Sequence, residues 1–103
     1  MKRVKRRYML LKIEMDAALN ERDFMDTVWA SITKLYGEVG ASQTGLCFID
    51  FEIERKIAVI RVSLVAQELV RASLATVTRV SGKEASVYVQ SVSGTLKALL
   101  NKS

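Results

Sequence analysis

The stretch KIAVIRVSLVAQELVRASL, residues 56–74, decides the fold. Its first half alternates β-branched and other apolar side chains with a period of two, which predicts a strand buried on at least one face. From Ala66 the apolar residues recur at intervals of three and four, which predicts an amphipathic helix. The residues of this stripe are Leu69, Val70, Leu74 and Val77. A buried strand that leads directly into a helix needs a second strand beside it and a sheet beneath the helix.

The sequence on either side of this stretch supplies three more strands. Residues 8–15 alternate apolar with mixed side chains and predict a first strand. Residues 46–54 alternate in the same way and turn tightly at residues 54 and 55 into the strand of the opening stretch, so the two are expected to form a hairpin. A turn at residues 81–83 precedes a fourth predicted strand over residues 84–90.

A first helix is predicted between the first two strands. Asn20 or Asp23 caps its amino end, and apolar residues follow at helical spacing. These residues are Phe24, Val28, Ile32 and Leu35. The helix is expected to end near Gly37, because residues 37–45 hold three glycines with Ser, Gln and Thr and lack an apolar period, which predicts a loop.

The resulting order of elements is βαββαβ. Split βαβ units of this order build an α+β ferredoxin-like sandwich, which is also the architecture of RRM domains: a four-stranded antiparallel sheet with two helices on one face. After the fourth strand, a short C-terminal helix with an apolar side is expected across an edge or the open face of the sheet. Its apolar residues are Leu96, Leu99 and Leu100. We therefore predict a single ferredoxin-like domain over residues 8–103.

Composition limits the chemistry that the chain can perform. Its 103 residues are enough for one domain with one modest core, and 50% hydrophobic content with no proline is typical of a compact protein. One cysteine and no histidine exclude a zinc site, an internal disulfide and histidine acid–base catalysis. Cys47 is expected to be a small buried residue and implies only a reducing compartment. Because the carboxylates are scattered, no catalytic residue and no metal ligand is assigned.

The positive charge is concentrated at the amino end. The net charge is +5, and the 96 residues after the first seven hold 11 basic and 11 acidic side chains. The basic residues of the first seven are Lys2, Arg3, Lys5, Arg6 and Arg7. Lys12 and Glu14 interrupt the following apolar stretch too early for a secretory signal, and no span reaches the length of a transmembrane helix. We therefore expect a cytoplasmic protein without a membrane anchor and with a basic arm over residues 1–7.

This arm predicts contact with RNA or DNA. Lys and Arg side chains near phosphates release condensed counterions and supply affinity without reading the sequence, whereas a merely solubilising tail is the alternative interpretation. RRM domains stack bases on aromatic residues of the third strand, but KIAVIRVSL contains no aromatic residue. Tyr8 and Tyr88 are accordingly expected to be half-buried strand residues.

The turn Ser93-Gly94-Thr95 precedes the C-terminal helix. Its backbone N–H groups are placed to receive a phosphate at the positive end of the helix, and an ordinary N-cap is the alternative. We expect a tight turn at Gly94, where a positive φ would make any side chain costly. The chain has no GxxxxGK[ST] pattern of the kind that binds nucleotides.

Four segments together carry a resemblance to a known family. They are KRRYMLLKI at residues 5–13, GEVGASQTGLCFIDFE at 37–52, IAVIRVSL at 57–64 and VQSVSGTLKALL at 89–100. Their most specific parts are Arg7-Tyr8-Met9-Leu10-Leu11, Ile60-Arg61-Val62 and Ser93-Gly94-Thr95-Leu96-Lys97. In this order and spacing, from about Arg6 to Lys97, the chain resembles protein component 2 of ribonuclease P, a family shared by the archaeal and eukaryotic enzymes. The strand before Lys56 carries more acids than is typical of that family.

The resemblance implies a non-catalytic subunit of the ribonucleoprotein endonuclease that removes the 5′ leader from precursor tRNA. The RNA subunit would carry the hydrolytic chemistry with Mg²⁺, and the protein would bind no cofactor. It would pair with ribonuclease P protein component 3, in a heterotetramer that could contain a homodimer of this chain. Together with component 3 it would stabilise the catalytic domain of ribonuclease P RNA. The RNA-binding residues expected from the arm and the resemblance are Lys2, Arg3, Lys5, Arg6, Arg7, Ser93, Gly94, Thr95 and Lys97.

Two other classes of protein share the βαββαβ order. An ACT-like regulatory domain would bind an amino acid near a glycine-bearing loop such as residues 37–45 and would not need the basic arm. A small hydrolase of the acylphosphatase type would need an anion-binding loop with an Arg after the first strand. That loop here reads MDAALNERD, with Arg22 but without glycine.

Overall fold

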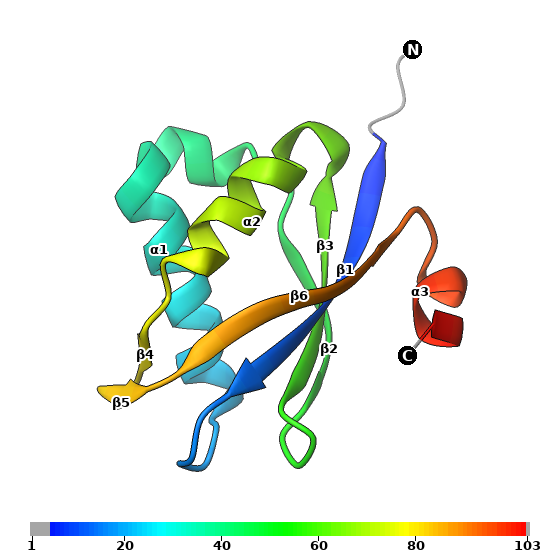
Figure 1. Cartoon of the computed structure of the whole chain (residues 1–103). Helices are drawn as coiled ribbons and strands as arrows, with labels where there is room; N and C mark the ends of the chain where they lie inside the picture. The colour runs from blue at the N-terminus through cyan, green and yellow to red at the C-terminus, as the bar shows by residue number, and fades with distance from the viewer. Residues whose placement is uncertain (1–4, 103) are drawn as a thin grey trace.

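The computed structural model describes residues 5–102, and it describes side chains as far as Leu99. The predicted RNA-binding residues Lys2 and Arg3, and the side chain of Leu100, lie outside the described residues. The elements in chain order are β1 (Arg6–Glu14), α1 (Glu21–Ser42), β2 (Cys47–Glu52), β3 (Ile57–Ser63), the 3₁₀ turn η1 (Leu64–Ala66), α2 (Gln67–Ala75), β4 (Arg79–Val80), β5 (Lys83–Glu84), β6 (Ser86–Ser93) and α3 (Leu96–Lys102) (Figure 1).

Four strands form one antiparallel sheet in the order β2-β3-β1-β6. β3 and β1 occupy the centre, so the strand of the opening stretch is central as predicted. The two βαβ halves interlock because β1 inserts between β3 and β6, which is the split arrangement of ferredoxin-like folds. The predicted α+β ferredoxin-like class is therefore confirmed.

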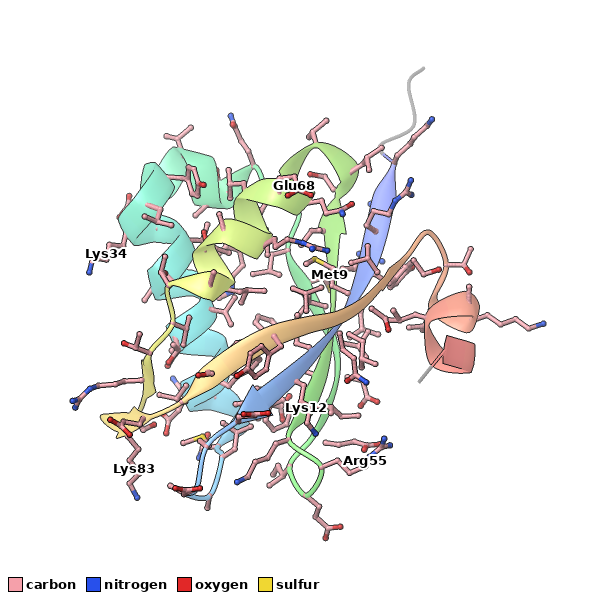
Figure 2. The ribbon with its side chains drawn as sticks, viewed as in Figure 1. Met9, Lys12, Lys34, Arg55, Glu68 and Lys83 are labelled. Carbon is pink, nitrogen blue, oxygen red and sulfur yellow. The ribbon has the colours of Figure 1, made fainter. Side chains whose placement is uncertain are left out.

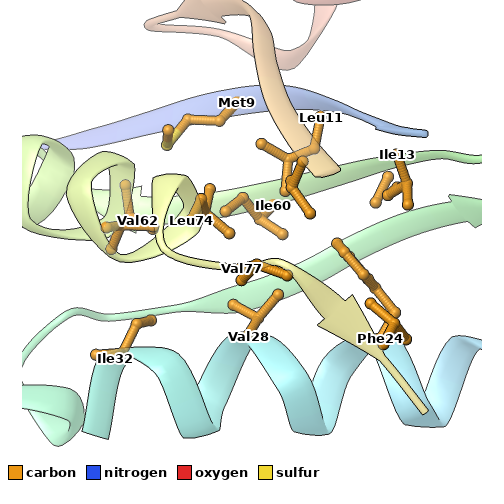
Figure 3. Close-up of a cluster of buried hydrophobic side chains, with 14 of the residues drawn as sticks. Met9, Leu11, Ile13, Phe24, Val28, Ile32, Ile60, Val62, Leu74 and Val77 are labelled. Carbon is orange, nitrogen blue, oxygen red and sulfur yellow. The ribbon is translucent and has the colours of Figure 1, made fainter. Parts of the chain in front are cut away.

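The main core lies between the sheet and the helices α1 and α2, which cover the same face (Figures 1 and 3). Alternate residues of the central strands point into it, as the period of two predicted. Figure 3 shows Met9, Leu11 and Ile13 of β1 above Phe24, Val28 and Ile32 of α1, whereas the predicted fourth member of the stripe, Leu35, is 46% exposed. The other labelled members of this core are Ile60, Val62, Leu74 and Val77, all buried.

A second, smaller apolar cluster lies on the opposite face of the sheet. Leu10 and Val59 point away from the main core, and Leu99 of α3 is fully buried against them. Leu96 of the same helix packs at the margin of this cluster with Tyr8. The prediction of a short C-terminal helix on the open face is confirmed, and burial of Leu99 is what holds that helix there.

The predicted loop over residues 37–45 is wrong for most of its length. Gly37 does interrupt the helix, with φ 76° and ψ 173°, but helical backbone resumes after it and continues to Ser42. Ala41 of this second part is buried, and the hydroxyl of Thr44 donates a 2.8 Å hydrogen bond to the Ala41 carbonyl. One buried alanine and a capping hydroxyl hold this turn of helix, and neither produces an apolar period in the sequence.

Three smaller differences concern the start of β1, the turn at residues 81–83 and the burial of Cys47. β1 begins at Arg6, two residues earlier than predicted. The predicted turn at residues 81–83 belongs to a two-stranded ribbon of β4 and β5, whose paired segments are too short to show alternation. Cys47 is half-buried instead of buried, because β2 is an edge strand.

The predicted cap of the first helix is confirmed. The Oδ1 of Asn20 accepts the backbone N–H of Arg22 at 2.9 Å. No helix between residues 5 and 102 is long and apolar enough to cross a membrane.

Candidate nucleic-acid interface

The amino-terminal start of β1 and the carboxyl-terminal end of β6 lie side by side. Tyr8 pairs with Ser93 in the antiparallel ladder between these strands. Figure 1 shows the start of β1 and the loop from β6 to α3 at the same end of the sheet. The pairing brings Arg7 next to the turn Ser93-Gly94-Thr95, so parts of two groups of residues predicted separately from the sequence lie together.

Arg7 lies directly against Gly94. A Cβ atom placed on Gly94 would be 3.3 Å from Arg7 Nη1 and 3.9 Å from its Cζ. Arg7 Nη1 also donates a 3.2 Å hydrogen bond to the Arg6 carbonyl, which fixes the guanidinium over the turn. The backbone of Gly94 is not in the left-handed region, since the glycines with positive φ are Gly37, Gly45 and Gly82. The condition under which a side chain at Gly94 would strain the backbone is therefore not met, and what the glycine provides is room for Arg7.

The hydroxyl groups of the turn cap α3. Thr95 Oγ1 accepts the backbone N–H of Ala98 at 3.2 Å, and Ser93 Oγ accepts the backbone N–H of Thr95 at 3.4 Å. These contacts favour the N-cap interpretation over a phosphate site made of helix N–H groups. Each hydroxyl retains its own proton as a donor toward an external acceptor.

The remaining described residues of the predicted set are Lys5, Arg6 and Lys97. Lys5 and Arg6 are exposed, and the Lys5 carbonyl accepts the backbone N–H of Leu64 at 2.7 Å, which ties the amino-terminal segment to the end of β3. Lys97 is exposed on α3. Their ammonium and guanidinium groups are free to approach a polyanion from solvent.

The carboxylates of the four-stranded sheet lie away from this basic end. They are Glu14, Asp50 and Glu52, at or beyond the middle of the sheet. A hollow of about 380 Å³ at the far end is lined by Glu14, Asp16 and Glu84 among others. Figure 2 shows Lys12 and Arg55 toward that end as well, and Glu68 on α2 in the helix layer. The half of the sheet that contains Arg6 and Arg7 thus carries positive charge without a carboxylate.

Sequence reasoning assigned no role to Arg61, which lies at the same end. It stands opposite Tyr8 on β1 and opposite Cys47 on β2, so it is in the interior of the sheet. The signal that could have found it is a single charged residue among the apolar side chains of a central strand. Among the residues that the structure describes, no group of three Cys, Asp or Glu side chains is arranged to hold a metal ion.

Replacing Gly94 with Ala should separate the structural role of the turn from its role in binding. Because φ is ordinary there, we expect the free energy of unfolding to change by no more than about 0.5 kcal/mol. The added methyl group would lie 3.3 Å from Arg7 Nη1 and push the guanidinium away by a few tenths of an ångström, so RNA affinity should fall by up to roughly threefold. Thermal unfolding and RNA binding of the same mutant measure both effects. Unchanged RNA affinity would leave the turn as a helix cap only.

The sequence matches one protein-family model and several curated relatives that share one name. The model of the Rpp14/Pop5 family matches residues 7–103. Curated relatives named ribonuclease P protein component 2 are similar along nearly the whole chain. The relative from Methanosarcina mazei is 33% identical, with 97% of this chain and 84% of the relative covered. Those from Methanosarcina barkeri and Pyrococcus horikoshii are 32% and 28% identical, each with 97% of this chain covered and with 73% and 83% of the relative.

One solved structure has the same fold. A chain in the cryo-EM structure of yeast ribonuclease MRP superposes with a TM-score of 0.71. The alignment covers 93% of this chain and 79% of that chain, at 18% sequence identity. The likeness supports the arrangement of helices and strands described above.

Proposed function

The chain belongs to the Rpp14/Pop5 family, and from this membership we propose that it is a protein subunit of ribonuclease P. In this role it supports removal of the 5′ leader from precursor tRNA by the RNA subunit. The observation that carries the proposal is the family match over residues 7–103, nearly the whole chain. The carboxylate-free basic end of the sheet supplies a surface suited to this role.

The protein would act by holding RNA and would not perform the chemistry. Lys5, Arg6 and Arg7 offer positive charge that neutralises backbone phosphates when the RNA subunit folds against them. In this proposal the RNA subunit would carry out the hydrolysis, and Mg²⁺ bound to that RNA would supply the metal-ion chemistry. The protein binds no cofactor of its own, and its compartment is the cytoplasm.

The open face of the sheet does not provide an RRM-type platform for stacked bases. α3 packs over the part of this face that contains Tyr8 and Leu10. Tyr88 is 49% exposed, but it stands alone beside Glu14, to which its hydroxyl is 3.5 Å away. Recognition through phosphates at the basic end therefore accounts for RNA binding better than stacking does. Family membership also decides against the ACT-like and acylphosphatase-like alternatives.

The protein partner in this proposal is ribonuclease P protein component 3. Large apolar side chains remain exposed near the break in α1 and after β3, which is typical of a surface that another protein covers. Val65 is 91% and Val39 71% exposed. The other large apolar side chains that are exposed are Leu35, Tyr36, Ile53 and Tyr88.

We expect the isolated protein to self-associate and to become monodisperse when it is mixed with component 3, because the partner would bury this apolar surface. A Leu35→Ser, Val39→Ser variant should self-associate less while it remains folded. Light scattering with and without component 3 measures the effect. A monodisperse wild-type monomer that shows no binding to component 3 would contradict this expectation.

Reconstitution tests the proposed function directly. The chain is mixed with a cognate ribonuclease P RNA and component 3, and cleavage of precursor tRNA is measured at limiting Mg²⁺. Under these conditions the RNA depends most on protein cations to balance its charge, so cleavage should accelerate when the chain is added. Equal cleavage rates with and without the chain would refute the proposal.

A further inference from the structure

Two polar atoms on β3 are buried without a hydrogen-bond partner in the described part of the chain. They are Nε of Arg61 and Oγ of Ser63. Ser63 is only 6% exposed. Buried polar groups are nearly always paired, because an unpaired donor loses its hydrogen bonds to water without replacement. Two such atoms two residues apart on one strand therefore need an explanation.

The register of the sheet places these side chains together. Arg61 and Ser63 alternate with Val62 of the main core, so they lie on the opposite face, as Val59 does. Ser63 stands opposite Arg6, which is exposed and lies on the same face of β1. An unpaired hydroxyl thus lies between two guanidinium-bearing residues.

Within residues 5–99, whose side chains the structure describes, no carboxylate forms an ion pair with Arg61. The single ion pair among the described residues joins Arg55 to Glu52 at the other end of the sheet, at 3.4 Å. Tyr8 and Cys47, the cross-strand neighbours of Arg61, are uncharged. The half-buried position of Arg61 reduces screening by water, so a hydrogen bond from its guanidinium to an anion would be strong.

We infer that Arg61, Ser63 and Arg6 form a binding site for one phosphate group of an RNA backbone. This inference rests on the proposed function and extends the interface from the β1–β6 edge across to β3. The outer guanidinium nitrogens of half-buried Arg61 match two phosphate oxygens that approach from solvent, and a shift of this side chain would open its buried Nε and the buried Ser63 hydroxyl to the same phosphate. Arg6 adds a second positive charge from the solvent side.

Phosphate is favoured over a protein carboxylate by the charge of the surroundings. Lys5 and Arg7 flank Arg6 along the chain and alternate to the other face, so an RNA strand that passes over this end of the sheet can reach them as well, and the nearest sheet positions carry no acid. A polyanion gains from all of these cations at once, whereas one carboxylate of a protein partner gains from only one or two.

Binding of the full-length chain to ribonuclease P RNA tests the site through two substitutions. Arg61→Lys keeps the charge but removes Nε and the planar fork, and Ser63→Ala removes only the hydroxyl. Each should weaken RNA binding roughly three- to tenfold. Ser63→Ala should leave the melting temperature unchanged or raise it, because the hydroxyl is unpaired without RNA. The matched controls are Arg71→Lys on the exposed side of α2 and Ser91→Ala on the same sheet face, and neither should change the affinity.

A titration with inorganic phosphate, followed through the NMR signal of Arg61 Nε–H, gives a second readout that does not depend on RNA. A phosphate-dependent shift of this signal, lost in Ser63→Ala, supports the site. Wild-type RNA affinity in both variants, or a loss of binding to component 3 in place of RNA, overturns it while the proposed function stands. If the wild-type chain neither binds the RNA nor accelerates cleavage, the proposed function fails, and an unmoved Nε–H signal then overturns the site as well.

Discussion

Alanine at the five basic positions of the amino-terminal segment should lower the affinity for ribonuclease P RNA at least about a hundredfold near 0.1 M salt. These positions are Lys2, Arg3, Lys5, Arg6 and Arg7. Each cation that lies against a phosphate displaces close to one counterion, so the slope of log affinity against log salt should flatten by at most about five. Filter binding or fluorescence anisotropy across a salt series measures both quantities. The loss should be similar for RNAs of different sequence, because phosphate contacts do not read bases.

The matched control removes the same charge from other surfaces. Its substitutions to Ala are at five exposed basic residues outside the basic end, namely Arg22, Lys34, Arg55, Arg71 and Lys83. If net charge alone determines affinity, both variants will lose affinity and slope equally. If the basic end is the interface, the control will keep most of the slope. An unchanged slope in the amino-terminal variant would refute the assignment of these residues.

Replacing Phe24 with Ala should cost about 3–5 kcal/mol of stability. The side chain is fully buried, and its ring lies 6.3 Å from that of Phe48 at 80° and 5.8 Å from that of Phe51 at 38°. It therefore joins the start of α1 to β2, an edge strand held in the sheet by β3 alone. Since a domain of this size is stable by only about 5–15 kcal/mol, this single cavity should bring the protein near its unfolding threshold. Urea denaturation followed by circular dichroism gives the difference.

Tyr36→Ala is the matched control for Phe24, because Tyr36 is an aromatic residue of the same helix that is 41% exposed. Its removal should cost less than about 1 kcal/mol. A similar loss of stability in the two variants would mean that the aromatic contacts between α1 and β2 do not hold the core together. The description of the core is therefore tested by whether Phe24→Ala destabilises the protein more than Tyr36→Ala does, as well as by the size of each loss.

The strands and helices that carry a long hydrophobic period were predictable from the sequence. β1, β3 and α2 each present alternating or helical stripes that match the side chains buried in the main core. The helical turn after Gly37 and the β4–β5 ribbon were not predictable from the sequence. Each is held by one or two local contacts, which produce no periodic pattern of apolar residues. Local turns depend on which single side chain finds a buried position, and that depends on the finished fold.

Part of the candidate site was also predictable, because it is marked by patterns in the sequence. The cluster of basic residues before β1 and the turn before α3 are visible as composition and as a motif, and the βαββαβ order makes their strands neighbours. The role of Gly94 was not predictable, because it comes from the reach of the Arg7 side chain across the strand pair. Arg61 and Ser63 were hidden because a missing hydrogen bond is visible only when all neighbours are placed.

The separation of charge along the strands should also affect how the protein and the RNA approach each other. Cations gather at the start of β1 without a carboxylate in that half of the sheet, whereas the carboxylates at the middle and far end are accompanied by Lys12 and Arg55, so we expect a dipole with its positive end at the start of β1. The field of a folded RNA exerts a torque on such a dipole and turns the basic end forward before contact. Productive encounters then become more frequent than a random search allows, and salt should slow association more than it speeds dissociation.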